Sequence, residues 1–384
     1  MEALDKQGDS LIVQKARIFC EINLQPVARE LDRQNRFPTE LLGQMREEGF
    51  FGMNYPAACG GGGYSAVETH KAIKEFAKVS AGVALTLHVH WMALDVLLKY
   101  GSDAQKQNYL PDLVQGRKIA AYTISEAQAG SDAAAIRANA APDGDGWILN
   151  GSKYFCTNGG LADVYFVAFK TEPEAGAKGI SMFVVEKGTP GFQIGVGEEK
   201  MGCRSSLTTG LVFKDCRVGA GALVGKANDG FRVAMYGLNG GRLGMASMGL
   251  GIAEAAMEAA ARYVNRRLAF GKPLSALYAI QAMLADMYVK MEAARLLVEQ
   301  AAQKRDDGAD YSLDTSVAKL FVAEMVTEVC HKALQVFGGH GYMKNLDLER
   351  YARDARLLDI GVGASEVLKM VVGSAVAKTI GSSG

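Results

Sequence analysis

The 384-residue sequence has no surplus of either charge, because 42 lysine and arginine residues balance 42 aspartate and glutamate residues. Proteins that hold nucleic acid or an anionic membrane by electrostatics usually carry a clear basic surplus. The zero formal charge therefore argues against both roles. We also expect no membrane span and no secretory signal, because neither a sufficiently long apolar run nor the signal pattern is present.

Cysteine is scarce and scattered through the chain. The six cysteines show neither a CxxC pair nor the spacing of a zinc site. Reduced thiols in a cytoplasmic protein are typical of this usage, and we expect no metal site.

The first third of the sequence has a helical pattern. Apolar residues recur at helical spacing through residues 10–50, and further helices are expected at 66–80 and 83–100. The last of these is apolar enough to be buried. Four consecutive glycines within 56–63 indicate a surface loop. We expect an α-helical domain over residues 1–120.

The middle and the C-terminal parts differ in pattern. Short β-prone runs separated by turn signals predict an antiparallel barrel or sandwich over residues 121–230. Helical periodicity then returns in long segments, which predicts a four-helix bundle over 231–384. The expected fold class is α+β. The β-prone runs are 147–151, 165–169, 180–185 and 211–213, and the helical segments are 231–267, 277–306, 313–337 and 363–380.

The stretch from Ala121 to Asp132 joins the helical part to the β-rich part. Its small and hydroxyl-bearing residues suit a loop whose backbone approaches a flat or anionic ligand. Gly130 tolerates a positive φ, and Ser131 and Asp132 could cap the segment after them. Such chemistry is also typical of an ordinary turn.

Six ordered stretches resemble the acyl-CoA dehydrogenase family, and the resemblance covers essentially the whole chain. The stretches are Tyr122 to Asp132, Asn150 to Gly160, Lys187 to Phe192, Gly240 to Arg242 with Arg267 to Pro273, Gln335 to Tyr342, and Arg353 to Arg356. The resemblance implies the family fold and an FAD cofactor that lies between the β-domain and the C-terminal helices.

Two groups of residues are implied to bind FAD. Tyr122, Ile124, Ser125 and Gly130 would contact the polar edge of the isoalloxazine, Phe155 would cover one ring face, and Thr157 would bond near N5. Arg267, Phe270, Gln335, Gly338 and Gly339 would meet the cofactor of a partner subunit, as in a homotetramer built as a dimer of dimers. Ala269, Leu277, Tyr278 and Ala364 depart from the family pattern, and each departure removes a possible polar contact to FAD.

For the acyl-CoA substrate, the resemblance implies contacts near the thioester and the CoA arm. The implied residues are Ser131, Asn239, Arg242, His88 on the floor of the acyl pocket, and Val362, whose backbone N–H would bind the thioester carbonyl.

The family's catalytic base is missing. The glutamate that removes the α-proton would stand at position 362 or position 241, which here are Val362 and Gly241. Loss of a general base typically lowers a rate by about 10² to 10⁴. His88, His90 and Asp95 on the pocket-floor helix are the candidate replacements, and we favour His90. Glu126 and Asp132 are implied to belong to the family scaffold, not to the proton-acceptor positions.

Three functions remain open at this point. The first is an FAD-dependent acyl-CoA dehydrogenase with a relocated base, which passes electrons to an electron-transfer flavoprotein. The second is a variant without a base, such as an enoyl-CoA reductase or a desulfinase-like lyase. The third is a silent subunit of a heteromer, although a silent subunit has no need of Phe155 and Thr157.

Overall fold

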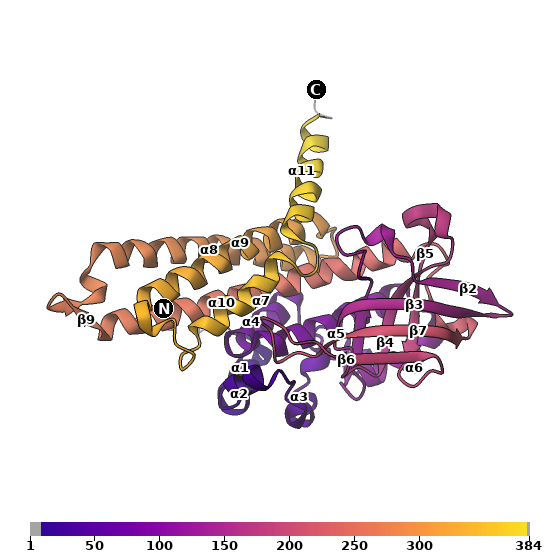
Figure 1. Ribbon diagram of the computed structural model, residues 1–384, viewed down its shortest axis with the longest axis horizontal. Helices are drawn as coiled ribbons and strands as arrows, with labels where there is room; N and C mark the ends of the chain where they lie inside the picture. Colours follow the sequence, from indigo (N-terminus) through magenta and orange to yellow (C-terminus); the bar gives the residue numbers. More distant parts are fainter. Residues whose placement is uncertain (1–8, 382–384) are drawn as a thin grey trace.

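A computed structural model describes residues 9–381 and separates them into N-terminal helices, a β-sheet and a C-terminal set of long helices (Figure 1). The sheet lies at one end of the elongated molecule, and the long helices extend from it towards the other end. The N-terminal helices pack beneath both parts. The first strand begins at Ala120 and the first long helix at Gly230.

Six helices form the N-terminal part: α1 Leu11–Phe19, α2 Ala28–Gln34, α3 Leu42–Glu47, α4 Ala66–Val79, α5 Ala81–Tyr100 and α6 Asp103–Val114. Capping boxes begin two of them, with Ser65 and Glu68 at α4 and Ser102 and Gln105 at α6. Sequence periodicity did not predict α6, whose polar and apolar residues alternate without a clear stripe around Pro111.

Helix α5 is the central element of the N-terminal part. Within residues 9–381 it is the one helix long and apolar enough to span a membrane, but 94% of its apolar window is buried in the protein. Burial on all sides is typical of a core helix, and apolar residues around its whole circumference are what such a helix requires.

One eight-stranded sheet forms the middle part. Its order is β6-β7-β3-β2-β4-β5-β8, with β1 paired to β4. Most pairs are antiparallel as expected, but β1 runs parallel to β4, which the sequence pattern did not predict. The strands are β1 Ala120–Thr123, β2 Asn139–Asp143, β3 Gly146–Thr157, β4 Val164–Lys170, β5 Ile180–Glu186, β6 Phe192–Gly197, β7 Thr208–Val218 and β8 Leu223–Val224.

The C-terminal part contains α7 Gly230–Arg266, α8 Tyr278–Asp306, α9 Ser312–Phe337, α10 Leu348–Ala355 and α11 Ser365–Gly381. Helices α7, α8 and α9 run side by side, and α11 stands out from the body of the molecule (Figure 1). A hairpin of β9 Leu268–Ala269 and β10 Lys272–Pro273 lies at the end remote from the sheet. The short helix α10 was not predicted from the sequence.

Glycines bring α5 and α7 into close contact. An ideal Cβ at Gly241 would lie 2.7 Å from the Met92 Sδ atom, and one at Gly244 would lie 2.8 Å from the His88 side chain. Such distances leave no room for a side chain on α7. The backbone of α7 therefore lies directly against the Met92 and His88 side chains of α5.

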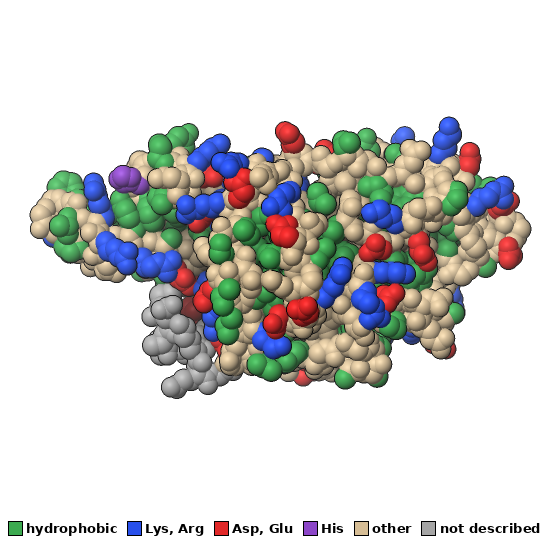
Figure 2. Space-filling model, turned by 90° about the horizontal axis from the view of Figure 1, so that it is seen from below, with side chains coloured by type: hydrophobic (Ala, Val, Ile, Leu, Met, Phe, Trp, Pro, Cys, Tyr) green, Lys and Arg blue, Asp and Glu red, His purple; other side chains and the backbone are tan. Residues whose placement is uncertain are grey.

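The surface carries both charge signs. Figure 2 shows lysine and arginine side chains mixed with aspartate and glutamate side chains over one whole face. This distribution agrees with the zero net charge, and it leaves no large field of one sign on that face.

We predict that Gly251→Ala destabilises the protein although alanine favours a helix. A Cβ at Gly251 would lie 2.3 Å from the Lys74 carbonyl oxygen on α4. Overpacking of this kind costs about 1–3 kcal/mol, to be measured as the free energy of unfolding in urea. Gly43→Ala is the control, because nothing lies within 4 Å of its Cβ position. Equal stability of Gly251→Ala and the unaltered protein would contradict the prediction.

Candidate active site

The two positions at which a catalytic base would stand meet in space. The Val362 Cγ1 atom lies 2.9 Å from the ideal Cβ position of Gly241, and the Met92 Sδ atom lies 2.7 Å from the same point. Residues far apart in the sequence thus form one apolar wall, made by Met92 of α5, Gly241 of α7 and Val362. This wall carries no group that can accept a proton.

The loop of residues 360–364 has an unusual backbone conformation. Val362 has φ +55° and Gly363 has φ +100°. A left-handed conformation is strongly disfavoured for a β-branched residue such as valine and persists only where the surroundings enforce it. The Val362 N–H makes no hydrogen bond with any residue from 9 to 381. A free amide on an enforced turn is suited to receive a carbonyl oxygen from a ligand.

Arg242 lies beneath this loop. Its Nη1 donates to the Asn239 Oδ1 atom at 3.1 Å and to the Ser316 Oγ atom at 3.3 Å. Its Nε lies 3.8 Å from the Cβ position of Gly363 and, in the described part of the chain, has no hydrogen-bond partner. Burial lowers the pKa of Arg242. The structure therefore brings Asn239, Arg242 and the loop of Val362 together.

The geometry contradicts the hypothesis that His90 is the catalytic base. Its Nδ1 accepts a hydrogen bond from the Ala120 N–H at 2.9 Å, and its Nε2 bonds the Leu113 carbonyl at 3.0 Å. The ring is fully buried, and burial lowers its pKa to about 4. Both nitrogens bond the main chain, so His90 joins α5 to α6 and β1. A periodic pattern could not reveal these backbone partners.

His88 and Asp95, the other two candidates, differ from each other. Both ring nitrogens of His88 are buried without a partner among residues 9–381, and burial lowers its pKa to about 3. Asp95 accepts hydrogen bonds from Arg305 at 2.7 Å and from Tyr55 at 2.9 Å. The Asp95 carboxylate is thus engaged in an ion pair with Arg305. The His88 ring is closely packed against Gly244.

A buried ion pair holds the loop that comes after β1. The Lys153 Nζ atom donates to the Glu126 carboxylate at 2.7 Å and to the Ile124 carbonyl at 3.0 Å. Glu126 also accepts from the Arg137 and Ala138 amides. Burial lowers the pKa of Lys153 to about 8 in spite of this partner. These contacts agree with a scaffold role for Glu126, whereas the sequence pattern gave no indication of Lys153 as its partner.

Tyr122 of β1 is held in place, whereas several residues of the loop after it are exposed. The Tyr122 hydroxyl donates to the Ala234 carbonyl at 2.7 Å, so its side chain ties β1 to α7. Ser125 is half-buried, whereas Gly130 and Ser131 are exposed. Gly130 is not among the glycines with positive φ, and Asp132 makes no side-chain cap, so neither expectation from turn chemistry is met.

Phe155 and Thr157 lie at the end of β3. The Phe155 side chain is 69% exposed, and a φ of +58° at a bulge between β3 and β7 turns it outwards. Thr157 is half-buried, and its hydroxyl makes no hydrogen bond within residues 9–381. An enforced, exposed aromatic ring beside a free hydroxyl fits a flat ligand with a polar edge.

The other proposed cofactor residues lie at the remote end of the molecule (Figure 1). Arg267 comes directly after α7, and Phe270 is 89% exposed in the turn between β9 and β10. Gln335, Gly338 and Gly339 are exposed at the end of α9. Stacking of Tyr263 on Phe337, with ring centroids 4.1 Å apart, joins the two segments. Within one chain, these five residues therefore lie far from Phe155 at the end of β3.

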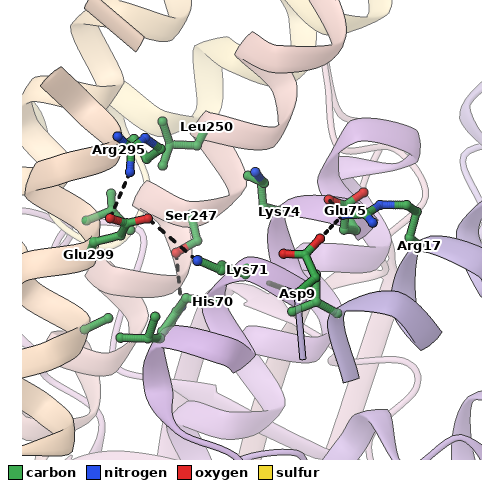
Figure 3. Close-up of a pocket in the computed structure, with 14 residues that line it drawn as sticks. Asp9, Arg17, His70, Lys71, Lys74, Glu75, Ser247, Leu250, Arg295 and Glu299 are labelled. Atoms are coloured by element: carbon green, nitrogen blue, oxygen red, sulfur yellow. Dashed lines mark hydrogen bonds and ion pairs between the residues drawn. The ribbon is translucent and has the colours of Figure 1, made fainter. Parts of the chain in front are cut away.

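A separate small cavity of about 50 Å³ lies among α1, α4, α7 and α8 (Figure 3). Its charged groups already have partners: Arg17 bonds Asp9 and Glu75, and Glu299 pairs with Arg295. The His70 ring bonds the Ser247 hydroxyl at 3.1 Å. These contacts join the N-terminal helices to the bundle and lack the free groups that a reaction would use.

The arrangement defines a class of protein: three consecutive domains around a site with a free loop amide, an unpaired arginine and an exposed aromatic platform. Comparisons with known proteins give the family. The acyl-CoA dehydrogenase N-terminal domain matches residues 7–117, its middle domain 121–216 and its C-terminal domain 228–377. The chain belongs to the acyl-CoA dehydrogenase family, whose members depend on FAD, and it is an oxidoreductase that acts on the Cα–Cβ bond of an acyl-CoA thioester.

Individual relatives are similar over nearly their whole length. An acryloyl-CoA reductase (NADH) of Anaerotignum propionicum is 43% identical over 94% of this chain and 93% of its own. A short-chain specific acyl-CoA dehydrogenase of Clostridium acetobutylicum is 41% identical, covering 94% and 96%. The structure of butyryl-CoA dehydrogenase from Megasphaera elsdenii has a TM-score of 0.93 at 39% identity, covering 96% of this chain and 99% of its own.

We predict that His90→Ala lowers stability without lowering reactivity. The change leaves the Leu113 carbonyl and the Ala120 N–H unpaired and opens a cavity, at a cost of about 2–4 kcal/mol in the free energy of unfolding. His331→Ala on the exposed side of α9 is the control. A folded His90→Ala protein that reacts at least a hundred times more slowly with substrate would restore His90 as the base.

Proposed function

We propose that the chain binds FAD and a short-chain acyl-CoA or enoyl-CoA, and that hydride moves between the substrate Cβ and the cofactor without a carboxylate at the usual base positions. Two neighbouring features support this proposal. The Val362 amide is free, and the wall made by Met92, Gly241 and Val362 beside it is apolar. The amide would receive the thioester oxygen and acidify Cα. The wall supplies no proton acceptor.

The residues present fit FAD. The Phe155 ring offers a face to the isoalloxazine, and the Thr157 hydroxyl and the Ser125 side chain are free to bond its polar edge. Tyr122 and Ile124 would contribute through their backbone, and the exposed Gly130 would allow a close approach. When bound, FAD would supply the hydride acceptor or donor. Fixed donors at the ring edge would hold it in one orientation towards the substrate.

A partner subunit completes this cofactor site in our proposal. Arg267, Phe270, Gln335, Gly338 and Gly339 would bind the pyrophosphate and adenine side of the partner's FAD. Large apolar side chains exposed near this group support burial in an oligomer, because monomers rarely expose such patches. Leu268 on the hairpin and Tyr278 at the start of α8 are among them. We propose the homotetramer, built as a dimer of dimers.

The substrate would have a short acyl group. Gly240, Gly241 and Gly244 let α5 approach α7 so closely that Met92 and His88 fill the space between the helices. The names of two relatives, short-chain specific acyl-CoA dehydrogenase and butyryl-CoA dehydrogenase, agree with this. Ser131, Asn239 and Arg242 would contact the thioester and the CoA arm. His88 would contact substrate only if α5 and α7 moved apart, because both of its ring nitrogens are buried.

The electron partner is proposed from relatives. A chain from the structural study of the electron transferring flavoprotein of Acidaminococcus fermentans aligns with a TM-score of 0.93 at 40% identity, covering 95% of this chain and 96% of its own. We propose an electron-transfer flavoprotein as the redox partner here as well. The exposed edge near Phe155 and the mixed-charge surface are compatible with transient docking.

A second candidate is an enoyl-CoA reductase. The observation that favours it is that the hydrogen-bond partners of Arg242 within residues 9–381 are the neutral Asn239 and Ser316, because hydride addition to an enoyl thioester generates an enolate that positive charge stabilises. Solvent would then provide the α-proton. The acryloyl-CoA reductase relative agrees with this direction.

The test is anaerobic mixing of the purified yellow protein with saturated acyl-CoAs of increasing length. We expect slow bleaching of the flavin, fastest with short chains, and faster reoxidation of reduced protein by the matching enoyl-CoA. A colourless protein, or one that acquires FAD only together with a second chain, would contradict the proposal and favour a silent subunit. Release of a β-substituent without bleaching would favour the lyase.

We further predict that Val362→Glu accelerates flavin bleaching by saturated acyl-CoA about 10²- to 10⁴-fold, because it returns a general base to the wall. The new carboxylate would also stand close to Arg242. Val362→Gln is the matched control, equal in shape without the charge, and should not accelerate the reaction. Equal rates for the two variants would show that proton removal does not limit the unaltered protein.

A further inference from the structure

Lys319 of α9 is fully buried directly under the 360–364 loop. Its side chain is 0% exposed, and its Nζ atom donates a hydrogen bond to the Gly363 carbonyl at 2.6 Å. Gly363 comes directly after Val362, the residue with the free amide, and both have left-handed φ. The hydrogen bond from Lys319 therefore holds the 363–364 peptide, at the other end of the Val362–Gly363 turn from the 361–362 peptide whose N–H would receive the thioester oxygen.

The charge of Lys319 is not balanced by an ion pair. Among residues 9–381 the hydrogen-bond partners of these cations are neutral: the Lys319 Nζ atom bonds the Gly363 carbonyl, and the Arg242 Nη1 atom bonds Asn239 and Ser316. The nearby Asp359 bonds Arg356, Ser365 and Thr327 instead. Burial lowers the pKa of Lys319 to about 8; Asp359 and Glu366 oppose this effect, and the positive charge of Arg242 adds to it. Two buried cations thus repel each other beneath one loop.

Buried cations without a partner are costly, so their presence calls for an anion in the working complex. The position at 362 that would carry a carboxylate in the resembling family holds valine here. In the proposed reaction, the anion that develops beside this loop is the enolate oxygen of the thioester. Fixed positive charge beneath that oxygen would stabilise it without any movement of the protein.

We propose that Lys319 is a positioning residue of the acyl thioester site: it fixes the Val362–Gly363 turn through the Gly363 carbonyl and, with Arg242, places unpaired positive charge beneath the amide that receives the thioester oxygen. The inference rests on the proposed function, because it needs an acyl-CoA in this site. It adds a buried side chain on α9 to the groups that set how strongly the site favours the enolate form of its ligand.

The experiment uses the yellow holoprotein and 3-oxobutanoyl-CoA, a β-oxo thioester that has an acidic α-proton and cannot be dehydrogenated at Cα–Cβ. A pH titration of the complex, followed through the absorbance of the enolate and its long-wavelength band with the flavin, gives the pKa of the bound ligand. Lys319→Met removes both the charge and the hydrogen bond, Lys319→Gln keeps a neutral donor, and Lys319→Arg keeps the charge. Flavin content and unfolding temperature establish that each variant is folded.

We expect the bound ligand to ionise at lower pH than the free ligand in the unaltered protein. Lys319→Met and Lys319→Gln should each weaken enolate binding at least tenfold, and Lys319→Arg should restore most of it. Thr327→Val is the control, since Thr327 also contacts the loop region through Asp359 but carries no charge; it should leave the ligand pKa unchanged.

An unchanged ligand pKa in Lys319→Met, or a Lys319→Gln variant equal to the unaltered protein, would overturn the role of the charge. Failure of the proposed function itself would be recognised by another result: the unaltered holoprotein would neither bind the β-oxo thioester nor shift its pKa. If Lys319→Met does not fold, the comparison of Lys319→Gln with Lys319→Arg decides the question.

Discussion

The close contact between α5 and α7 is the constraint on which the site depends. Gly241 and Gly244 let the helices approach until Met92 and His88 occupy the space that a longer acyl chain would need. The same contact sets Gly241 against Val362, so the two possible base positions share one wall. A side chain on α7 at either glycine would force the helices apart and move the wall.

Around this contact, buried polar groups fix the segments that lack regular structure. Lys153 and Glu126 hold the loop after β1, and His90 uses both nitrogens to bond the main chain of neighbouring elements. Buried polar groups are stable only when they are paired, so such contacts specify one arrangement of the loops. Lys319 does the same for the 360–364 loop, but its charge is left without a carboxylate partner among residues 9–381.

Charge and conformation at the site point to the same chemistry. The free Val362 amide and the cations Arg242 and Lys319 would favour negative charge on the thioester oxygen of the proposed substrate, while the apolar wall offers no proton acceptor. In the proposed function, such a site would stabilise an enolate and exchange its proton slowly. The slow proton step is what separates it from a site with a glutamate at position 362.

The sequence by itself determined the order of the three parts, the long helices and the family, because these depend on local periodicity and on motifs that are contiguous in the chain. It could not predict α6, α10 or the parallel pairing of β1 with β4, since weak amphipathic patterns and strand partners are decided by packing. Only the tertiary structure decided the candidate site: His90 is committed to backbone hydrogen bonds and Lys319 lies beneath Gly363. Both facts depend on contacts between residues far apart in the sequence, which no local pattern encodes.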